Sequence, residues 1–148
     1  MPNNTLYNRV TLPSSKSTNV ARPQMYKGFS SINSKSKNFK LFDFELVKQD
    51  LINSFHVRQG ERLMQPEIGC IIWDLLFEPL TEEVKELILQ NVNDIVNSDP
   101  RISPKNVVVT QYETGIQIEM ILVYVIYNLQ ENLQIQFDQA NGLRSTLG

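Results

Sequence analysis

The residue types that most often do chemistry are scarce in this chain of 148 residues. It contains one cysteine, Cys70, and one histidine, His56. A nucleophilic pair would need these two side chains in contact, and nothing in their spacing favours such a contact. One residue of each type leaves no plausible four-ligand set for a structural zinc site. A lone cysteine also excludes an intrachain disulfide, and we expect Cys70 to be a small buried residue. We therefore expect no metal.

Carboxylates are the other groups that could support catalysis, because glycoside hydrolysis uses two of them on either side of the scissile bond. The chain has 16 acidic residues, which allow many pairs and select none. Glu61, Glu67 and Glu78 flank a predicted extended stretch and a short helix, where a solvated surface role is the more common one. Gly60 and Gly69 are isolated, so the sequence lacks a glycine-rich phosphate loop. We expect no catalytic site and no cofactor.

A charged corner at Asp99-Pro100-Arg101 lies between a long predicted helix and the first predicted strand. One interpretation is a helix stop with a surface salt bridge. The other is a rigid partner-binding corner, in which Pro100 restrains the backbone and the Arg101 guanidinium binds a carboxylate or a helix end. The sequence alone leaves both interpretations open.

Three helices are predicted upstream of this corner. Apolar residues at spacings of three and four predict a helix that begins at Asp43, as its N-cap, and ends near His56. A short apolar helix is predicted over residues 71–77. A third helix is predicted to begin with Thr81 as its cap and to end at Asp99.

Downstream of Ile102 the apolar period changes from 3.6 to 2, which is typical of strands. The alternation predicts strands over residues 102–112, Ile116–Tyr127 and Leu133–Phe137, joined by tight turns. The expected fold is therefore α+β, with about three helices packed on a three-stranded antiparallel meander and an extended N-terminal arm.

The last predicted strand has no charge and no proline between its ends. It consists of Leu133, Gln134, Ile135, Gln136 and Phe137. Sheet edges are normally protected by lysine, proline or a bulge, and this strand lacks such protection. We predict that it either accepts a strand from another chain or is covered by the arm.

The net charge of −2 conceals two oppositely charged parts. Residues 1–40 hold seven basic side chains and no acid, whereas residues 41–148 hold seven basic and all 16 acidic side chains and carry −9. We expect a basic extended arm over 1–40, a folded domain over 41–140 and a C-terminal tail over 141–148. The arm is either a disordered tail, a nucleic-acid-binding segment, or a segment that orders against a partner or the acidic body. We favour the last, because the aromatic residues of the arm can serve as anchors. Nucleic-acid binding is the weaker alternative, because the arm has no dense basic cluster and the body is acidic.

Membrane insertion is not expected. The longest apolar run, Met120–Tyr127, has eight residues, well short of the roughly 18 that a membrane helix needs. The first residues show no basic-then-apolar signal pattern, which favours synthesis and use in a cytoplasm.

Four blocks of sequence follow one another in a recognisable order. They are Gln59-Gly60-Glu61-Arg62, Pro66-Glu67-Ile68-Gly69-Cys70, the stretch Asp74–Thr81, and Asp99-Pro100-Arg101-Ile102. Together these blocks resemble the baseplate wedge and sheath-initiator family of contractile phage tails, often labelled lysozyme-like, and its branch in T-even-type marine phages. The resemblance covers about Asp43 to Phe137.

The resemblance implies a structural virion protein of the tail baseplate, located where the baseplate meets the tail tube and the first sheath ring. Its implied partners are other baseplate wedge proteins, the tail sheath protein and tail-tube-associated proteins, without nucleic acid or membrane. Assembly is expected in the host cytoplasm. The family's charged corner is usually Glu-Pro-Arg, so Arg101 carries over directly and Asp99 is one methylene shorter.

The family's strand-donating hairpin corresponds to Ile116–Tyr127 and Leu133–Phe137, which implies that this chain templates sheath polymerisation by β-strand addition. The lysozyme label implies a peptidoglycan-cleaving enzyme as the alternative. We expect no enzymatic activity, because no defined carboxylate pair is present.

Overall fold

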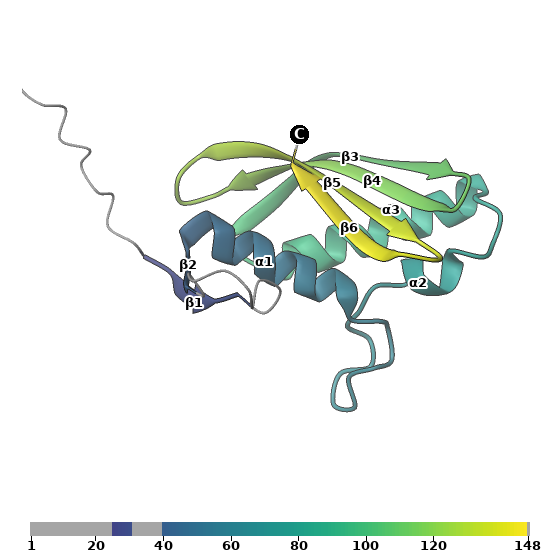
Figure 1. Cartoon of the computed structure of the whole chain (residues 1–148), viewed down its shortest axis with the longest axis horizontal. Coiled ribbons are helices and arrows are strands. Elements are labelled where there is room, and N and C mark those ends of the chain that lie inside the picture. The colour runs from purple at the N-terminus through teal and green to yellow at the C-terminus, as the bar shows by residue number, and fades with distance from the viewer. Residues whose placement is uncertain (1–24, 31–39, 148) are drawn as a thin grey trace, which may run out of the picture.

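Three helices and two antiparallel sheets make up most of the described part of the chain (Figure 1). The structure is a computed structural model that describes residues 25–30 and 40–147. In chain order the elements are β1 (Lys27–Phe29), β2 (Lys40–Phe42), α1 (Asp43–His56), α2 (Ile72–Leu75), α3 (Glu82–Asn97), β3 (Ile102–Tyr112), β4 (Gly115–Tyr124), β5 (Leu129–Asp138) and β6 (Gly142–Leu147).

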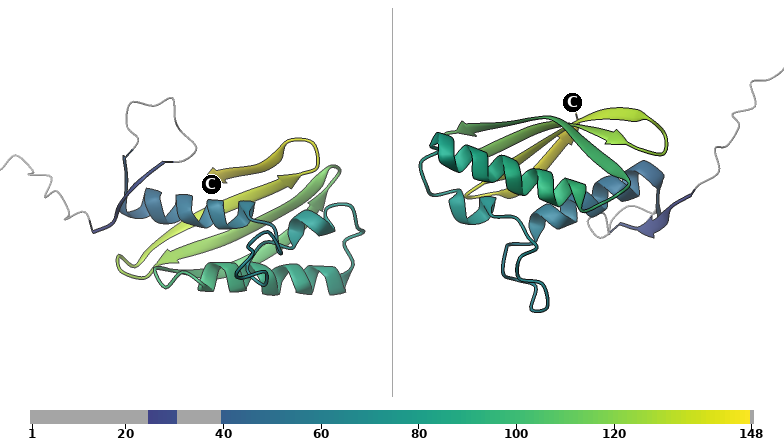
Figure 2. Two further views of the ribbon diagram at one scale, coloured as in Figure 1. Left: turned by 90° about the horizontal axis from the view of Figure 1, so that it is seen from below. Right: turned by 180° about the vertical axis from the view of Figure 1, so that it is seen from behind.

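The helices lie on one face of the larger sheet, whose strand order is β3-β4-β5-β6 (Figure 2). Strand side chains alternate between the two faces, so one face of β4 and β5 is apolar and buried under the helices. The apolar stripe of α3, at Ile88, Val92 and Val96, supplies the other side of the same core. The predicted α+β class, with three helices and antiparallel strands, is confirmed.

The predicted three-stranded meander is wrong, because the larger sheet has four strands. The predicted C-terminal tail forms β6, which pairs with β5 from Asp138↔Gly142 to Leu133↔Leu147. The turn is built by Asp138, whose Oδ1 accepts from the backbone N–H of Ala140 at 2.8 Å and of Asn141 at 3.1 Å. Gly142 follows with φ of +74°, which glycine adopts without strain.

The interpretation of Leu133–Phe137 as a sheet edge is consequently wrong. These residues lie in β5, between β4 and β6, with Ile135 opposite Ile118 on one side and Ser145 on the other. Their apolar side chains are buried in the core, and Gln134 and Gln136 face the opposite side of the sheet.

Asp43 is not the N-cap of α1. The cap is Phe42, which makes no side-chain cap hydrogen bond, and Asp43 is the first helical residue with φ of +44°. The Asp43 carboxylate instead accepts from the backbone N–H groups of Met25 and Tyr26, both at 2.9 Å. It therefore ties the described part of the arm, where β1 pairs with β2, to the start of α1.

Of the other two predicted helices, α3 begins where the sequence predicts and α2 is shorter than predicted. Helix α3 begins after Thr81, whose hydroxyl accepts from the Val84 N–H at 3.3 Å, as predicted. Helix α2 is shorter than expected, with only four residues. Its Trp73 donates from Nε1 to the Phe55 carbonyl at 2.8 Å and lies edge-on to Phe137, which joins α1, α2 and β5.

Candidate functional site

The charged corner is a compact turn between α3 and β3. Ser98 ends the helix, and its hydroxyl donates to the Ile95 carbonyl at 2.6 Å. The Asp99 N–H donates to the Val96 carbonyl at 3.2 Å, and the Ile102 N–H donates back to Asp99 at 3.3 Å. These bonds, with the restricted φ of Pro100, define the direction in which β3 leaves the helix.

Arg101 folds back onto Asp99 within this turn. Its Nε lies 2.8 Å from Asp99 Oδ1 and its Nη2 lies 2.6 Å from Asp99 Oδ2, while the Arg101 N–H also donates to Oδ1 at 3.0 Å. Such paired, charge-assisted bonds are among the stronger ones in proteins. The hydrogen bonds from Arg101 hold the pKa of Asp99 below its ordinary value, and those from Asp99 raise the pKa of Arg101.

Two residues far away in the sequence complete this group. The Arg101 Nη2 also donates to Asp50 Oδ2 of α1 at 2.9 Å. The Arg101 guanidinium carbon lies 5.4 Å from the ring centroid of Tyr26, in the described part of the arm. The corner therefore joins α3, β3, α1 and the arm, and its two carboxylates and one guanidinium carry a net charge of −1.

Sequence reasoning found Asp99, Pro100 and Arg101 but missed Asp50 and Tyr26. Asp50 lies 51 residues before Arg101. It is one of several polar residues of an amphipathic helix, so no local sequence pattern distinguishes it from the others. The Arg101 side chain is 23% exposed and that of Asp99 is 17% exposed. The salt bridge of the first interpretation is thus present. The partner-binding role of the second remains a prediction.

The two edges of the larger sheet differ in their protection. Strand β3 carries Pro104, Lys105 and an irregularity between Lys105 and Val108, where Asn106 has φ of +49°. Strand β6 pairs only with β5 among the described residues, and Arg144 is its single charged residue. By the usual rules of edge protection, β6 is the more accessible template for another strand.

Residues with possible catalytic chemistry are not assembled into a site. Cys70 is fully buried, and burial raises the pKa of its thiol to about 12. His56 is exposed, with Nδ1 2.9 Å from the Ile52 carbonyl of its own helix. Glu61, Glu67 and Glu78 are all exposed.

Within the described ranges, no cluster of three metal-ligating side chains occurs. None of the described helices is both long enough and apolar enough to cross a bilayer.

The fold and the corner define an α+β domain in which β6 is an open strand edge among the described residues and the α3–β3 turn is held by a salt bridge. The sequence model of the family described as "Baseplate wedge protein gp25" matches residues 43–133. The chain belongs to this family. The matched stretch runs from the start of α1 into β5 and includes the corner.

One curated relative agrees with this assignment. "Baseplate wedge protein gp25" of Enterobacteria phage T4 is 32% identical over 100 residues, which cover 66% of this chain and 76% of that protein. A structure of a putative tail lysozyme from Geobacter sulfurreducens has a TM-score of 0.55 and 24% identity, covering 64% of this chain and 88% of the other. That likeness concerns the fold alone. A structure of the anti-feeding prophage baseplate has a TM-score of 0.45 and 20% identity, covering 82% of this chain and 77% of the matched chain.

Proposed function

We propose that this protein is a structural component of a contractile tail baseplate, within the virion, and that it templates the first ring of sheath through the open edge of β6. Membership of the baseplate wedge family supports the location. The single observation that carries the templating role is the contrast between the protected edge at β3 and the accessible edge at β6.

Strand addition at β6 would continue an existing ladder. Within the described residues β6 forms six register pairs with β5, from Asp138↔Gly142 to Leu133↔Leu147. Hydrogen-bonding groups alternate along an antiparallel strand, so half of the β6 backbone groups point toward β5 and half point away. The groups that point away offer main-chain hydrogen bonds to an extended segment of a sheath subunit.

The residues Leu133–Phe137 support this edge from one strand further in. Their buried apolar side chains anchor β5 to the helices, and β5 in turn positions β6. Partner contact by Gln134 and Gln136 is still a prediction, now through the polar face of the sheet rather than through its edge. The incoming strand would bring its own side chains next to Arg144 and Thr146 on that polar face.

The corner at Asp99, Pro100 and Arg101 is the proposed anchor in the wedge. The Arg101 Nε and Nη2 atoms are already bonded within the chain. The solvent-facing part of the group is therefore Asp50, whose side chain is 45% exposed, and the outer edge of the guanidinium. A partner that offers a basic group to Asp50 fits this surface, because the group carries a net negative charge.

We propose a non-enzymatic role, without cofactor, nucleic acid or membrane. The glutamates that could cleave a glycan are exposed and solvated, and one of them, Glu61, is used locally to accept from the Arg58 N–H at 3.0 Å. The proposed partners are other wedge proteins, the sheath protein and proteins associated with the tail tube. Assembly would take place in the host cytoplasm.

The templating role can be tested with a variant whose β6 edge cannot accept another strand. A chain with both Ser145→Pro and Thr146→Lys should enter baseplates normally but leave them without sheath, because proline cannot donate and lysine protects an edge. The matched control is Thr110→Lys on the β3 edge, which should leave sheath assembly unchanged. Electron microscopy of tails assembled with each variant reads the result, and sheath on the β6 variant would refute the templating role.

A further inference from the structure

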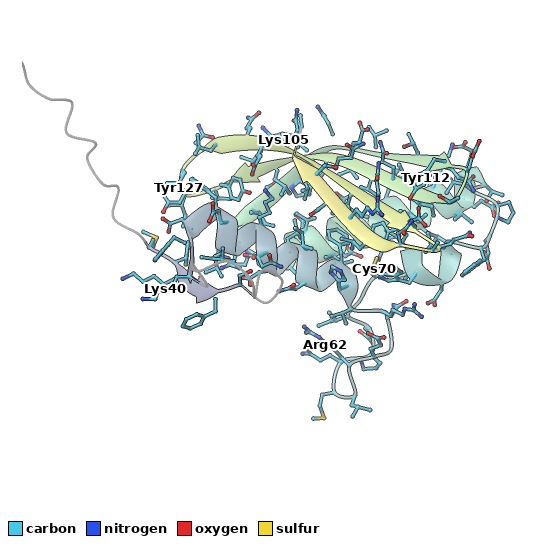
Figure 3. All side chains as sticks on the ribbon, in the orientation of Figure 1. Lys40, Arg62, Cys70, Lys105, Tyr112 and Tyr127 are labelled. Carbon is cyan, nitrogen blue, oxygen red and sulfur yellow. The ribbon has the colours of Figure 1, made fainter. Side chains whose placement is uncertain are left out.

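The loop between α1 and α2 projects away from the helical layer, as the ribbon and the labelled Arg62 show (Figures 1 and 3). Its tip carries Leu63 and Met64, whose exposed fractions are 97% and 94%. Among the described residues these are the two most exposed large apolar side chains. Neither the charged corner nor the β6 edge makes use of them.

The tip is held by a network of main-chain hydrogen bonds. The Gly60 N–H donates to the Pro66 carbonyl at 3.0 Å, which closes the loop below the tip. The Gln65 N–H donates to the Arg62 carbonyl at 3.2 Å, which makes a tight turn around Leu63 and Met64. The two apolar side chains are therefore presented by a defined turn.

The base of the loop is fastened to the folded body. The Cys70 N–H donates to the Val57 carbonyl at 2.8 Å. The Asn91 side chain, on α3, donates to the Gly69 carbonyl at 3.1 Å and accepts from the Ile71 N–H at 3.2 Å. Gly69 packs so closely that a Cβ there would lie 2.6 Å from the backbone of Arg58. The loop is thus braced at both its tip and its base.

We propose that Leu63 and Met64 form an anchor that inserts into an apolar pocket on a neighbouring baseplate wedge protein. This inference rests on the proposed function, because it requires a wedge assembly. A stable protein interface buries about 1,200–2,000 Å² in total, more than a narrow tip can supply. The tip therefore acts within a larger contact, and its braced geometry lowers the entropy lost on docking.

Charge around the tip narrows the chemistry of that pocket. Residues 63–66 are uncharged, with Arg62 on one side and Glu67 on the other. The pocket should thus be apolar and neutral inside, with an acidic group on the rim near Arg62. A second copy of this chain is a rival occupant, and the measurements below distinguish it from a wedge protein. An anionic lipid surface is disfavoured, because residues 41–148 carry a charge of −9.

The first test compares Leu63→Ser/Met64→Ser with Gln65→Ser, a control in the same turn. Each chain is mixed with the purified wedge proteins of the same virus, and its affinity is measured. The apolar variant should bind about tenfold or more weakly, with unchanged circular dichroism and unfolding temperature, while the control binds like the unaltered chain. Equal affinities for all three chains would overturn the proposal.

The second test reads burial at the tip directly. Cys70 is buried and has a raised pKa, so Leu63→Cys introduces a single reactive thiol into the folded chain. A maleimide should label this thiol rapidly in the free protein and at least tenfold more slowly in the wedge complex. If the thiol is labelled equally fast in the free protein and in a wedge that contains the chain, the proposed anchor is overturned while the proposed function stands. If the chain does not enter the wedge at all, the proposed function itself fails.

Two further measurements assign the tip to another occupant and would equally overturn the proposal. One is a dimer of the purified chain in analytical ultracentrifugation that disappears in the Leu63→Ser/Met64→Ser chain. The other is binding of the unaltered chain to phosphatidylglycerol vesicles that is lost in the same variant.

Discussion

Arg101 Nη2 lies 2.9 Å from Asp50 Oδ2, and this single bond connects the first long helix to the turn from which the sheet begins. Arg101 also binds Asp99 through Nε and Nη2, so one guanidinium bridges a carboxylate of α1 and a carboxylate of the α3–β3 turn. The corner is thus a structural joint as well as a proposed anchor, and stability and assembly can be measured separately.

Replacement of the guanidinium should weaken the joint. Arg101→Ala should lower the free energy of unfolding by about 1–3 kcal/mol, because it leaves two carboxylates without their shared donor. Arg101→Lys should recover only part of the loss, since lysine cannot reproduce the paired bonds to Asp99. Urea unfolding measures the stability of both variants. Lys85→Ala is the control, because its ion-pair partner Glu82 has a side chain that is 86% exposed. If Arg101→Ala lowers the free energy of unfolding no more than Lys85→Ala does, Arg101 does not stabilise the contact between α1 and the α3–β3 turn.

The same variant tests the anchor role. Arg101→Ala should keep the native circular dichroism spectrum yet fail to enter wedges. Co-purification with the other wedge proteins measures this. Normal incorporation at a temperature where the variant is folded would show that Arg101 serves stability alone.

The Asp99–Arg101 pair predicts a specific dependence of stability on pH. The pKa of Asp99 in the folded state is lower than its ordinary value, so the pair's stabilisation is present above the unfolded-state pKa of about 4. It is lost as the pH falls through the folded-state pKa. Asp99→Asn should therefore be less stable than the unaltered protein at pH 7, and the difference should shrink below about pH 4. A difference that stays constant from pH 7 to pH 3 would contradict this.

Asp43 should control the docking of the arm. Its carboxylate accepts from the Met25 and Tyr26 N–H groups, and its φ of +44° is unfavourable for alanine. Asp43→Ala should destabilise the protein by about 1–2 kcal/mol and speed hydrogen exchange at those two amides. Asp43→Asn retains an acceptor oxygen and tolerates the backbone angle, so exchange there should stay closer to that of the unaltered chain. Unchanged exchange in the alanine variant would refute the link.

Removal of the last strand tests the corrected topology. A chain that ends at Asn141 lacks β6 and the partly buried Leu143, so its free energy of unfolding should fall by roughly 1–3 kcal/mol. It should also aggregate more readily, because β5 becomes an unprotected edge. Thermal unfolding and light scattering measure the two effects. An unchanged unfolding temperature would mean that β6 is not part of the stable sheet.

The sequence by itself determined the class of fold, the extent of α1 and α3, the cap at Thr81 and the family. These features depend on local periodicity, capping chemistry and ordered motifs, which are visible without tertiary information. It also singled out Asp99, Pro100 and Arg101 as a corner, because a proline between opposite charges is a local pattern.

Only the tertiary structure decided which strand lies at the edge of the sheet and what the corner contacts. The C-terminal segment has too few apolar residues to predict a strand alone, yet β5 offers it a ready ladder of hydrogen-bonding groups. Asp43 resembles a helix cap, but the arm competes for its carboxylate. Asp50 and Tyr26 reach Arg101 across 51 and 75 residues of chain, and such contacts depend on packing between elements, which a local pattern does not encode.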